Sequence, residues 1–538
     1  MLNEFPLVVE NLTFQYRSRT ELAIEKINFS IQPGQVMLIA GSSGCGKTTL
    51  MRCINGLIPH TYQGEKSGDI RLFGKSVTGL GLADISQTVG TLLQDPERQI
   101  LGSYVMNEVA FGLESLGIPR EEITPRVEKA LGRLGILHLR DRETFGTSGG
   151  EKQKIALAGV LAMEPKILLL DEPLASLDPM SAHEALGAFR QLADEGIAVI
   201  IVEHRVEDVL SIHPDVFMYM DEGKMVYLGD TDGLMDVVDY RRIKLPARVV
   251  LERARRDPAP IFLPVMSPDV REEPLVRFEN VHFRYHEDSP EVLKDVNFSI
   301  HPGDVIGILG HNGSGKTTMV KHALGLLKPT EGRVLLEGVD TRKKTVAQAA
   351  HTVGYVFQSP SQMLFAPTVR QELAFGPKNL GFRSDEIEKN VDRAIETVNL
   401  KSEIEMPPLA LSFGQQKRIS IAAILAMRSR ILMMDEPTAG QDYWNYQAFM
   451  DAILQMPGFD AVIFITHDID LAVIYANRIL LVYSGEIVAD GKPQEVLKDE
   501  ILLRSCRVLP TSLLKLNLEY LPKTGRFYRA ETLAHVQS

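Results

Sequence analysis

A phosphate-binding loop pattern occurs twice in this chain of 538 residues, and it constrains the fold more than any other feature. Both copies fit Gly-x-x-x-x-Gly-Lys-Thr, in which glycines let the backbone turn so that successive N–H groups converge on an anion. A short apolar run precedes each copy, at Val36–Ala40 and Val305–Leu309, and helical sequence follows. This order of strand, loop and helix places phosphates at the positive end of the helix dipole. The chain is therefore predicted to bind nucleotide at two sites.

The pattern also names the residues expected to hold the phosphates. Lys47 and Lys316 are expected to reach the β- and γ-phosphates, and the following threonines offer hydroxyls to Mg²⁺. Cys45 lies in the first loop at a helix N-terminus, which predicts a lowered pKa and a reactive thiol, although a small filler residue explains it equally well. The full sets are Gly41, Ser42, Gly44, Cys45, Gly46, Lys47, Thr48 and Thr49, and Gly310, Asn312, Gly313, Ser314, Gly315, Lys316, Thr317 and Thr318.

Composition and length limit the class of protein. A hydrophobic content of 44% and a charged content of 24% are ordinary for a globular protein, and 538 residues predict two or more domains. The net charge of −12 argues against a protein that coats nucleic acid. No apolar run approaches the ~18–20 residues of a membrane span, and the start of the chain shows no secretory signal. Three cysteines cannot form a disulfide framework, so we expect a cytosolic protein.

The two halves of the chain are tandem homologous units. Lys47 and Lys316 are separated by 269 positions, and Tyr16 and Tyr285 have the same separation. Asp171 and Asp435 are separated by 264 positions, and such a near-constant offset indicates duplication of a whole domain with small loop insertions. We predict a first domain over residues 1–240, a proline-containing linker over 241–272 with one helix near 247–256, a second domain over 273–500 and an extension over 501–538. The pattern does not reveal the role of the extension.

An acidic pair follows a second apolar strand in each half. The pairs are Asp171-Glu172 and Asp435-Glu436. An Asp at the carboxyl end of a strand beside the phosphate loop can hold Mg²⁺, and the neighbouring Glu can polarise an attacking water as a general base. An acidic strand end facing solvent is the alternative, but the recurrence of the pair in both halves disfavours it.

Histidine and tyrosine residues also recur at strand ends. His204 and His467 follow the next strands, where each could donate to the γ-phosphate or orient the water. Tyr16 and Tyr285 end the first strand of each half. Each tyrosine alone is more typical of a core residue, but its ring could stack on a purine base.

A serine-glycine motif precedes a long helix in each half. Serine and glycine at a helix start can form a second anion site, and the alternative is an ordinary helix N-cap. The motif residues are Ser148, Gly149 and Gly150 in the first half, and Ser412, Phe413 and Gly414 in the second.

Together these motifs resemble those of ATP-binding cassette proteins with two fused nucleotide-binding domains, over about residues 5–235 and 273–500. The resemblance implies an α/β fold of two tandem P-loop NTPase domains. Each domain is expected to have a RecA-like parallel-sheet core, a β subdomain and a helical subdomain that carries the serine-glycine signature. In this family the domains pair head to tail, with ATP between the phosphate loop of one and the signature of the other. Further motif residues are Gln94, Gln358, Ser176-Leu177-Asp178 and Gly440-Gln441-Asp442.

The resemblance implies two composite sites that bind ATP and Mg²⁺. The implied catalytic residues are Glu172, Glu436, His204, His467, Gln94 and Gln358. The implied metal ligands are Thr48, Gln94, Asp171, Thr317, Gln358 and Asp435. The first site would combine Tyr16, Lys47, Thr48, Gln94, Asp171, Glu172 and His204 with Ser412 and Gly414, and the second would combine Tyr285, Lys316, Thr317, Gln358, Asp435, Glu436 and His467 with Ser148, Gly149 and Gly150.

Two residues depart from the family pattern, and both belong to the first implied site. Phe413 replaces the first signature glycine, where a side chain could crowd the γ-phosphate or strain the turn. Gln441 is also unusual. These differences lead to the hypothesis that the first site hydrolyses ATP more slowly than the second.

The segments after Gln94 and Gln358 resemble the docking region of energy-coupling factor (ECF) transporter ATPases, which drive uptake of vitamins and metal ions. The resemblance implies two partners, a transmembrane coupling subunit and a substrate-binding membrane subunit, and a peripheral location on the cytoplasmic face of the cell membrane. We expect Val109, Phe111, Leu373 and Phe375 to line a groove for coupling helices, the alternative being a helix packed on its own domain. The transported solute cannot be inferred, because a separate membrane protein binds it.

Another class of protein shares the ATP motifs. Soluble twin-cassette proteins that act on ribosomes or DNA typically add a long basic linker, an iron–sulfur domain or zinc modules. The sequence shows none of these, and we expect no nucleic-acid partner. An exporter would bring membrane helices in the same chain or a different segment after the glutamine.

Overall fold

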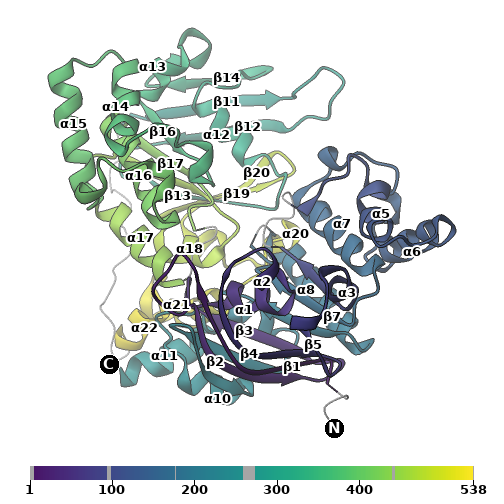
Figure 1. The fold of residues 1–538 in the computed structure, drawn as a ribbon. Helices are drawn as coiled ribbons and strands as arrows, with labels where there is room; N and C mark the ends of the chain where they lie inside the picture. Colours follow the sequence, from purple (N-terminus) through teal and green to yellow (C-terminus); the bar gives the residue numbers. More distant parts are fainter. Residues whose placement is uncertain (1–4, 94–98, 176, 258–272, 439–442, 537–538) are drawn as a thin grey trace. The chain divides into compact units, whose positions relative to one another are not determined.

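The computed structural model describes residues 5–93, 99–175, 177–257, 273–438 and 443–536. The chain divides into two compact units, mainly Met1–Val249 and Val250–Gln441 with Asn445–Ser538 (Figure 1). The exact domain and linker bounds given above stay predictions. The helix expected in the linker is confirmed as α11 (Ala247–Arg256).

The first unit is built on one sheet with a parallel core and an antiparallel arm. The sheet has ten strands in the order β5-β4-β1-β2-β10-β9-β3-β8-β7-β6. Strands β6, β7, β8, β3 and β9 pair in parallel, whereas β1 pairs with β2 and β4 in antiparallel fashion. The bounds are β1 Leu7–Tyr16, β2 Ile24–Ile31, β3 Val36–Gly41, β4 Gly64–Leu72, β5 Lys75–Ser76, β6 Val89–Leu92, β7 Ile167–Asp171, β8 Ala198–Val202, β9 Val216–Asp221 and β10 Lys224–Gly229.

The second unit repeats this order in two sheets. One sheet has the order β12-β11-β14-β15, and the other has β16-β17-β18-β13-β19-β20, which matches β6-β7-β8-β3-β9-β10 strand for strand. The shared order confirms the duplication read from the sequence. The bounds are β11 Val276–Phe283, β12 Leu293–Ile300, β13 Val305–Leu309, β14 Glu331–Leu336, β15 Val339–Asp340, β16 Val353–Val356, β17 Ile431–Asp435, β18 Ala461–Ile465, β19 Arg478–Tyr483 and β20 Glu486–Gly491.

The strands that lead into the phosphate loops lie in the middle of each parallel sheet. Every residue of β3 and β13 is buried, as expected for continuous apolar runs covered on both faces. Each loop therefore starts from the most firmly packed part of its unit.

Three helices form a group in each unit, α5, α6 and α7 in the first and α14, α15 and α16 in the second (Figure 1). These groups correspond to the helical subdomain expected from the sequence. Helix α6 ends at Arg133, two residues before Gly135, whose left-handed φ of 68° stops the helix. The bounds are α5 Val105–Ser115, α6 Arg120–Arg133, α7 Gly149–Ala162, α14 Val369–Asn379, α15 Ser384–Thr397 and α16 Phe413–Ala426.

Helices α1 and α12 begin at the loop lysines. The remaining described α-helices lie against the sheets or come after them in the chain. The bounds are α1 Lys47–Ile54, α2 Leu57–His60, α3 Leu82–Thr88, α8 Pro179–Asp194, α9 Val206–Leu210, α10 Thr231–Val237, α12 Lys316–Ala323, α13 Val346–Ala350, α17 Tyr443–Gln455, α18 Ile469–Tyr475, α19 Pro493–Val496, α20 Glu500–Ser505, α21 Ser512–Thr524 and α22 Ala530–Val536.

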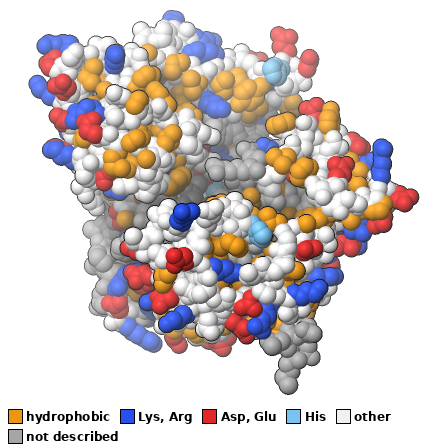
Figure 2. Space-filling model, in the orientation of Figure 1, with side chains coloured by type: hydrophobic (Ala, Val, Ile, Leu, Met, Phe, Trp, Pro, Cys, Tyr) orange, Lys and Arg blue, Asp and Glu red, His pale blue; other side chains and the backbone are white. Residues whose placement is uncertain are grey.

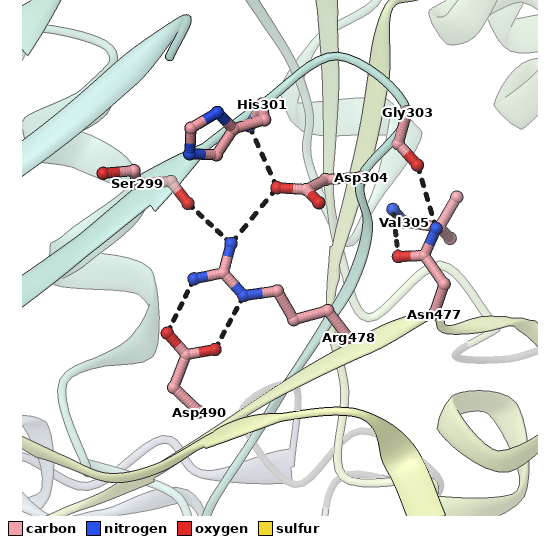
Figure 3. Close-up of polar contacts among 8 residues, drawn as sticks. All are labelled: Ser299, His301, Gly303, Asp304, Val305, Asn477, Arg478 and Asp490. Atoms are coloured by element: carbon pink, nitrogen blue, oxygen red, sulfur yellow. Dashed lines mark hydrogen bonds and ion pairs between the residues drawn. The ribbon is translucent and has the colours of Figure 1, made fainter. Parts of the chain in front are cut away.

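A buried arginine joins the two sheets of the second unit. Arg478, at the start of β19, forms two hydrogen bonds of 2.6 Å with the Asp490 carboxylate and one of 2.7 Å to the Ser299 carbonyl oxygen (Figure 3). It also contacts Asp304 at 3.2 Å, in the turn before β13. Asn477 holds the start of β13 through the N–H of Val305, at 2.9 Å. The β subdomain is thus fixed to the strand that carries the second phosphate loop.

The C-terminal extension forms helices that belong to the second unit. Thr511 donates a hydrogen bond of 2.5 Å to Asp470 near the start of α18. Arg529 pairs with Asp451 of α17 and donates to the Tyr475 hydroxyl of α18 at 2.6 Å. The extension therefore braces the helices that follow β17 and β18. In the described part of the chain, no helix is both long and apolar enough to cross a membrane.

Candidate nucleotide sites

The geometry of each phosphate loop requires glycine. Gly46 and Gly315, just before α1 and α12, have φ of 103° and 104°, a conformation that side chains strongly disfavour. A Cβ on Gly41 would lie 2.3 Å from the carbonyl oxygen of Met220, and one on Gly310 would lie 2.2 Å from that of Val482. Both loops can therefore turn closely against the neighbouring strand only with these residues.

Both loop lysines are buried and point back into their own loops. Lys47 Nζ donates to the carbonyl oxygens of Gly41 and Ser42, both at 2.8 Å. Lys316 Nζ makes the same two contacts with Gly310 and His311, at 2.7 and 2.8 Å. Each ammonium group is thus held at the loop where phosphate oxygens are expected.

The acidic pairs have an unusual backbone. Glu172 and Glu436 follow the last residues of β7 and β17 and have φ of 47° and 45°, in the left-handed region. Each is held there by its N–H, which donates to Val202 and Ile465 respectively at 2.9 Å. Such strain persists where the surrounding structure imposes it, and it gathers at functional sites.

A histidine pairs with each of these glutamates. His204 Nε2 lies 2.8 Å from Glu172 Oε1, and His467 Nδ1 lies 2.9 Å from Glu436 Oε1. Burial alone would raise the pKa of both glutamates, but the hydrogen bonds and charges of the histidines outweigh it and hold each pKa below its usual range. The two carboxylates are therefore ionised and able to accept a hydrogen bond from a water molecule.

The aspartates before these glutamates behave differently. Burial and the charge of Glu172 raise the pKa of Asp171 to about 6. Burial and Glu436 also raise the pKa of Asp435, although hydrogen bonds from Tyr355 and Thr317 partly offset this. A bound cation would relieve the unfavourable charge at both positions.

Sequence reasoning missed several neighbours of these groups. Glu203 is buried beside His204, accepts hydrogen bonds of 2.9 Å from the N–H groups of Leu174 and His204, and has a raised pKa because of burial and Glu172. The corresponding residue in the second unit is Thr466, whose hydroxyl lies 3.3 Å from Glu436. Glu203 and Thr466 directly follow β8 and β18, and this position could have drawn attention to the difference between the units. No sequence motif marks the position.

The serines of the signature motifs are helix N-caps. Ser148 caps α7, and its hydroxyl donates to Glu151 at 2.8 Å. Ser412 caps α16 in the same way, with Gln415 at 3.0 Å. Their role in holding a second anion stays a prediction.

Phe413 does not strain its turn, and that part of the hypothesis is wrong. It is the first residue of helix α16 and is not among the described residues with a positive φ. A Cβ at the corresponding Gly149 would meet no atom within 4 Å. A phenylalanine is accommodated here because the backbone at this position is ordinary helix, which does not require glycine. Whether it crowds a phosphate is a separate prediction.

The expectation for the Cys45 thiol is also wrong. Burial raises its pKa, and the nearby Lys47, at 3.8 Å, offsets this only in part. The side chain is buried, so it fits the simpler explanation of a small filler residue.

The tyrosines contact the helices that follow the phosphate loops. The hydroxyl of Tyr16 lies 3.1 Å from that of Thr49, and the hydroxyl of Tyr285 lies 3.3 Å from that of Thr318. Tyr285 is half exposed, which leaves its ring available to a base. Gln358 is exposed two residues beyond β16. Gln94, Ser176, Gly440, Gln441 and Asp442 lie outside the described residues.

The residues expected to line a docking groove divide into two groups. Val109 and Leu373 are fully buried in their own helical subdomains, so their assignment to a groove is wrong. Phe111 and Phe375 face outward and are each 50% exposed. The apolar face of each helix packs on its own domain, and only the aromatic residue two positions later is available to a partner.

The loops, acidic pairs and parallel sheets together define a nucleotide triphosphatase of the P-loop class. The family profile described as ABC transporter matches residues 24–175 and 293–439. A relative from Methanosarcina mazei is 35% identical and covers 95% of this chain and 93% of its own length. One from Streptococcus pneumoniae is 36% identical and covers 94% of both chains. Both are named only as ABC transporter ATP-binding proteins, with no substrate in the name.

A solved structure is similar to part of the chain. It is described as cbiO1 from Clostridium perfringens, part of the ABC transporter complex cbiONQ, and is 33% identical. The similarity covers 47% of this chain and 96% of that chain, with a TM-score of 0.40. The family profile and the full-length relatives show that the chain belongs to the ABC transporter ATP-binding proteins, as a twin-cassette ATPase.

Proposed function

We propose that this chain is the energy-coupling ATPase of an ECF-type importer, which drives uptake of a vitamin, metal ion or related micronutrient through separate membrane subunits. The observation that carries the proposal is an exposed aromatic side chain in the helix after each glutamine segment. Phe111 of α5 and Phe375 of α14 occupy this position. In the second unit, Phe365 is 61% exposed and packs edge-on against Phe375, with ring centroids 4.8 Å apart.

Exposed aromatic residues of this kind fit an apolar partner. An amphipathic helix of a membrane subunit would cover them by placing its apolar face between the rings. The chain would then lie on the cytoplasmic face of the cell membrane as a peripheral subunit. The face drawn in Figure 2 shows basic and acidic side chains interspersed, which offers no continuous basic surface to nucleic acid there.

The residues present fit Mg²⁺ together with ATP. Thr317 Oγ1 donates to Asp435 Oδ2 at 3.0 Å, so a hydroxyl and a carboxylate meet beside the second loop. Among the described residues, no group of three His, Cys, Asp or Glu side chains could hold a metal alone. Mg²⁺ commonly takes one or two carboxylates and completes its shell with phosphate oxygens and water. When bound, it would neutralise charge on the transferring phosphate.

The protein groups around this site have separable roles in hydrolysis. Lys316 exchanges its loop carbonyls for phosphate oxygens and stabilises negative charge on them. Glu436 accepts a hydrogen bond from the attacking water and takes its proton as the bond to phosphorus forms. His467 fixes the orientation of Glu436, 2.9 Å away, and would donate a hydrogen bond to the γ-phosphate. The residues Lys47, Glu172 and His204 would do the same in the first unit.

Co-purification from membranes tests the importer proposal. A tagged chain carrying Phe111→Asp and Phe375→Asp is expected to lose its membrane partners while it still binds ATP. Leu326→Asp is the matched control, since Leu326 is 52% exposed but lies outside the aromatic positions. Retention of membrane partners by the double variant, or isolation of the chain with ribosomal RNA, would contradict the proposal.

A further inference from the structure

The acidic residue expected to serve the metal is held differently in the two units. In the second unit, Tyr355 Oη donates a hydrogen bond of 2.8 Å to Asp435 Oδ2, the oxygen that also accepts from Thr317. Tyr355 lies on β16 and pairs in register with Met433 of β17. Asp435 is two residues further along β17, on the same face of the sheet, so a long tyrosine side chain reaches it diagonally.

The ring of Tyr355 is itself fixed. It packs against the core of the second unit and against Phe357, with ring centroids 4.9 Å apart and an angle of 71° between the rings. The hydroxyl therefore has little freedom to turn away from Asp435. Two donors on one oxygen hold the carboxylate in one orientation and leave Oδ1 for another ligand.

The described residues of the first unit include no equivalent donor. Thr91 occupies the matching position and pairs with Leu169, two residues before Asp171. Its hydroxyl accepts a hydrogen bond of 3.3 Å from Asn55 instead, and a threonine is too short to span the diagonal. Among the described side chains, none donates a hydrogen bond to the Asp171 carboxylate.

We propose that Tyr355 is a positioning residue for Mg²⁺ in the second nucleotide site, and that the two sites of this chain differ in metal affinity because only the second has it. Hydrogen bonds from such neighbours orient ligating carboxylates, and their loss typically weakens metal binding by about 10- to 100-fold. The second site therefore binds its metal more tightly than the first. The inference rests on the proposal that Asp435 and Thr317 hold Mg²⁺.

Manganese binding tests the inference without relying on turnover. Mn²⁺ replaces Mg²⁺ as the probe, and the free ion is counted by electron paramagnetic resonance in the presence of a non-hydrolysable ATP analogue. We expect two classes of site in the full chain. Tyr355→Phe should weaken Mn²⁺ binding at the tighter class of site by about tenfold, toward the affinity of the weaker class. Thr91→Val is the matched control in the first unit and should change neither class.

Two further measurements separate a positioning role from packing and from failure of the ATP site. Tyr355→Met also lacks the hydroxyl, so both variants should weaken Mn²⁺ binding to a similar extent while Tm stays unchanged. Unchanged Mn²⁺ affinity in both variants, or weakening only in a variant with a lowered Tm, overturns the inference. Analogue binding in EDTA reports on the phosphate loops alone. If the unaltered chain binds the analogue neither in EDTA nor in the presence of Mn²⁺, the result contradicts the proposed function and not this inference.

Discussion

Arg478 and Asp304 illustrate at the scale of single residues how charge is buried in the second unit. Their side chains are only 9% and 3% exposed, and Arg478 also pairs with Asp490 at 2.6 Å. Removing one partner of such a pair leaves a buried charge, which is far less favourable than removing both. Arg478 thus ties the β subdomain, through the Ser299 carbonyl oxygen, to the turn before the phosphate-loop strand.

Replacing Arg478 should destabilise the second unit strongly. We expect Arg478→Met to lower the free energy of unfolding by about 3–5 kcal/mol, because it leaves the buried Asp304 carboxylate without its cationic partner. Differential scanning calorimetry of the full chain measures it. Arg333→Met is the control, since Arg333 pairs with Glu279 at 2.6 Å but is 56% exposed. A combined Arg478→Met and Asp304→Leu variant should recover part of the loss; equal Tm values in all variants would contradict this account.

Lys417 makes stability depend on pH. Burial lowers its pKa to about 7, against the opposing effect of Glu436, and its ammonium group lies 2.6 Å from the Pro437 carbonyl oxygen. Between pH 7 and its ordinary pKa of about 10.4, the unfolded chain holds a proton on this lysine that the folded chain has lost. The buried charge on Lys417 therefore destabilises the folded state below about pH 7. The free energy of unfolding then rises with pH between pH 7 and about 10.4, because the folded chain no longer carries that charge.

The first unit supplies the matched replacement for Lys417. Gln153 occupies the corresponding position and donates to the Pro173 carbonyl oxygen. We expect the unaltered chain to gain stability relative to Lys417→Gln by about 1 kcal/mol per pH unit between pH 7 and 9. Urea unfolding of both proteins at several pH values measures the difference. A constant difference across this range would show that Lys417 keeps its proton.

At the scale of elements, the C-terminal helices brace α17 and α18. Arg529 is 11% exposed and contacts one residue from each of these helices, Asp451 and Tyr475. Arg529→Met should raise amide hydrogen exchange in α17 and α18 by about tenfold, because the charged hydrogen bonds it removes contribute about 1.5–3 kcal/mol. Exchange in the first unit should not change. Arg504→Met, at a 58% exposed site, is the control, and equal exchange in both variants would contradict the bracing role.

Sequence patterns predicted the elements that local chemistry determines. Glycine spacing, apolar runs and carboxylates at strand ends located the loops, β3, β13, β7 and β17, because each pattern is contained in a few neighbouring residues. The assignment of Val109 and Leu373 to a docking groove was wrong, since apolar periodicity shows that a face is covered but not whether its own domain covers it. Tyr355 and Lys417 went unnoticed because their partners, Asp435 and Pro437, lie 80 and 20 residues further along the chain.

The same limit applies to the acidic pairs. The residue types of Glu172 and Glu436 were readable, but their left-handed backbone was not, because it is imposed by hydrogen bonds to β8 and β18. Likewise, a raised pKa for Cys45 follows from burial that the loop pattern alone does not reveal.

At the scale of the whole molecule, the resemblance to ABC proteins leads us to predict that each ATP is bound by the phosphate loop of one unit and the signature serine of the other. On this prediction, the duplicated units would supply both halves of two such sites. Neither half-site would suffice alone, because ATP would join the units and their separation after hydrolysis would release the products. The central claim is therefore that Ser148 serves the nucleotide of Lys316, and Ser412 that of Lys47.

Site-resolved photolabelling with an azido-ATP analogue under vanadate trapping tests this claim most directly, with mass spectrometry distinguishing peptides near Tyr16 from those near Tyr285. Ser148→Glu places a negative charge against the phosphates and should abolish trapping near Tyr285 while leaving that near Tyr16. Ser412→Glu should give the reverse pattern. Loss of trapping in the unit that carries the substitution, with the other unit unaffected, would contradict the shared sites.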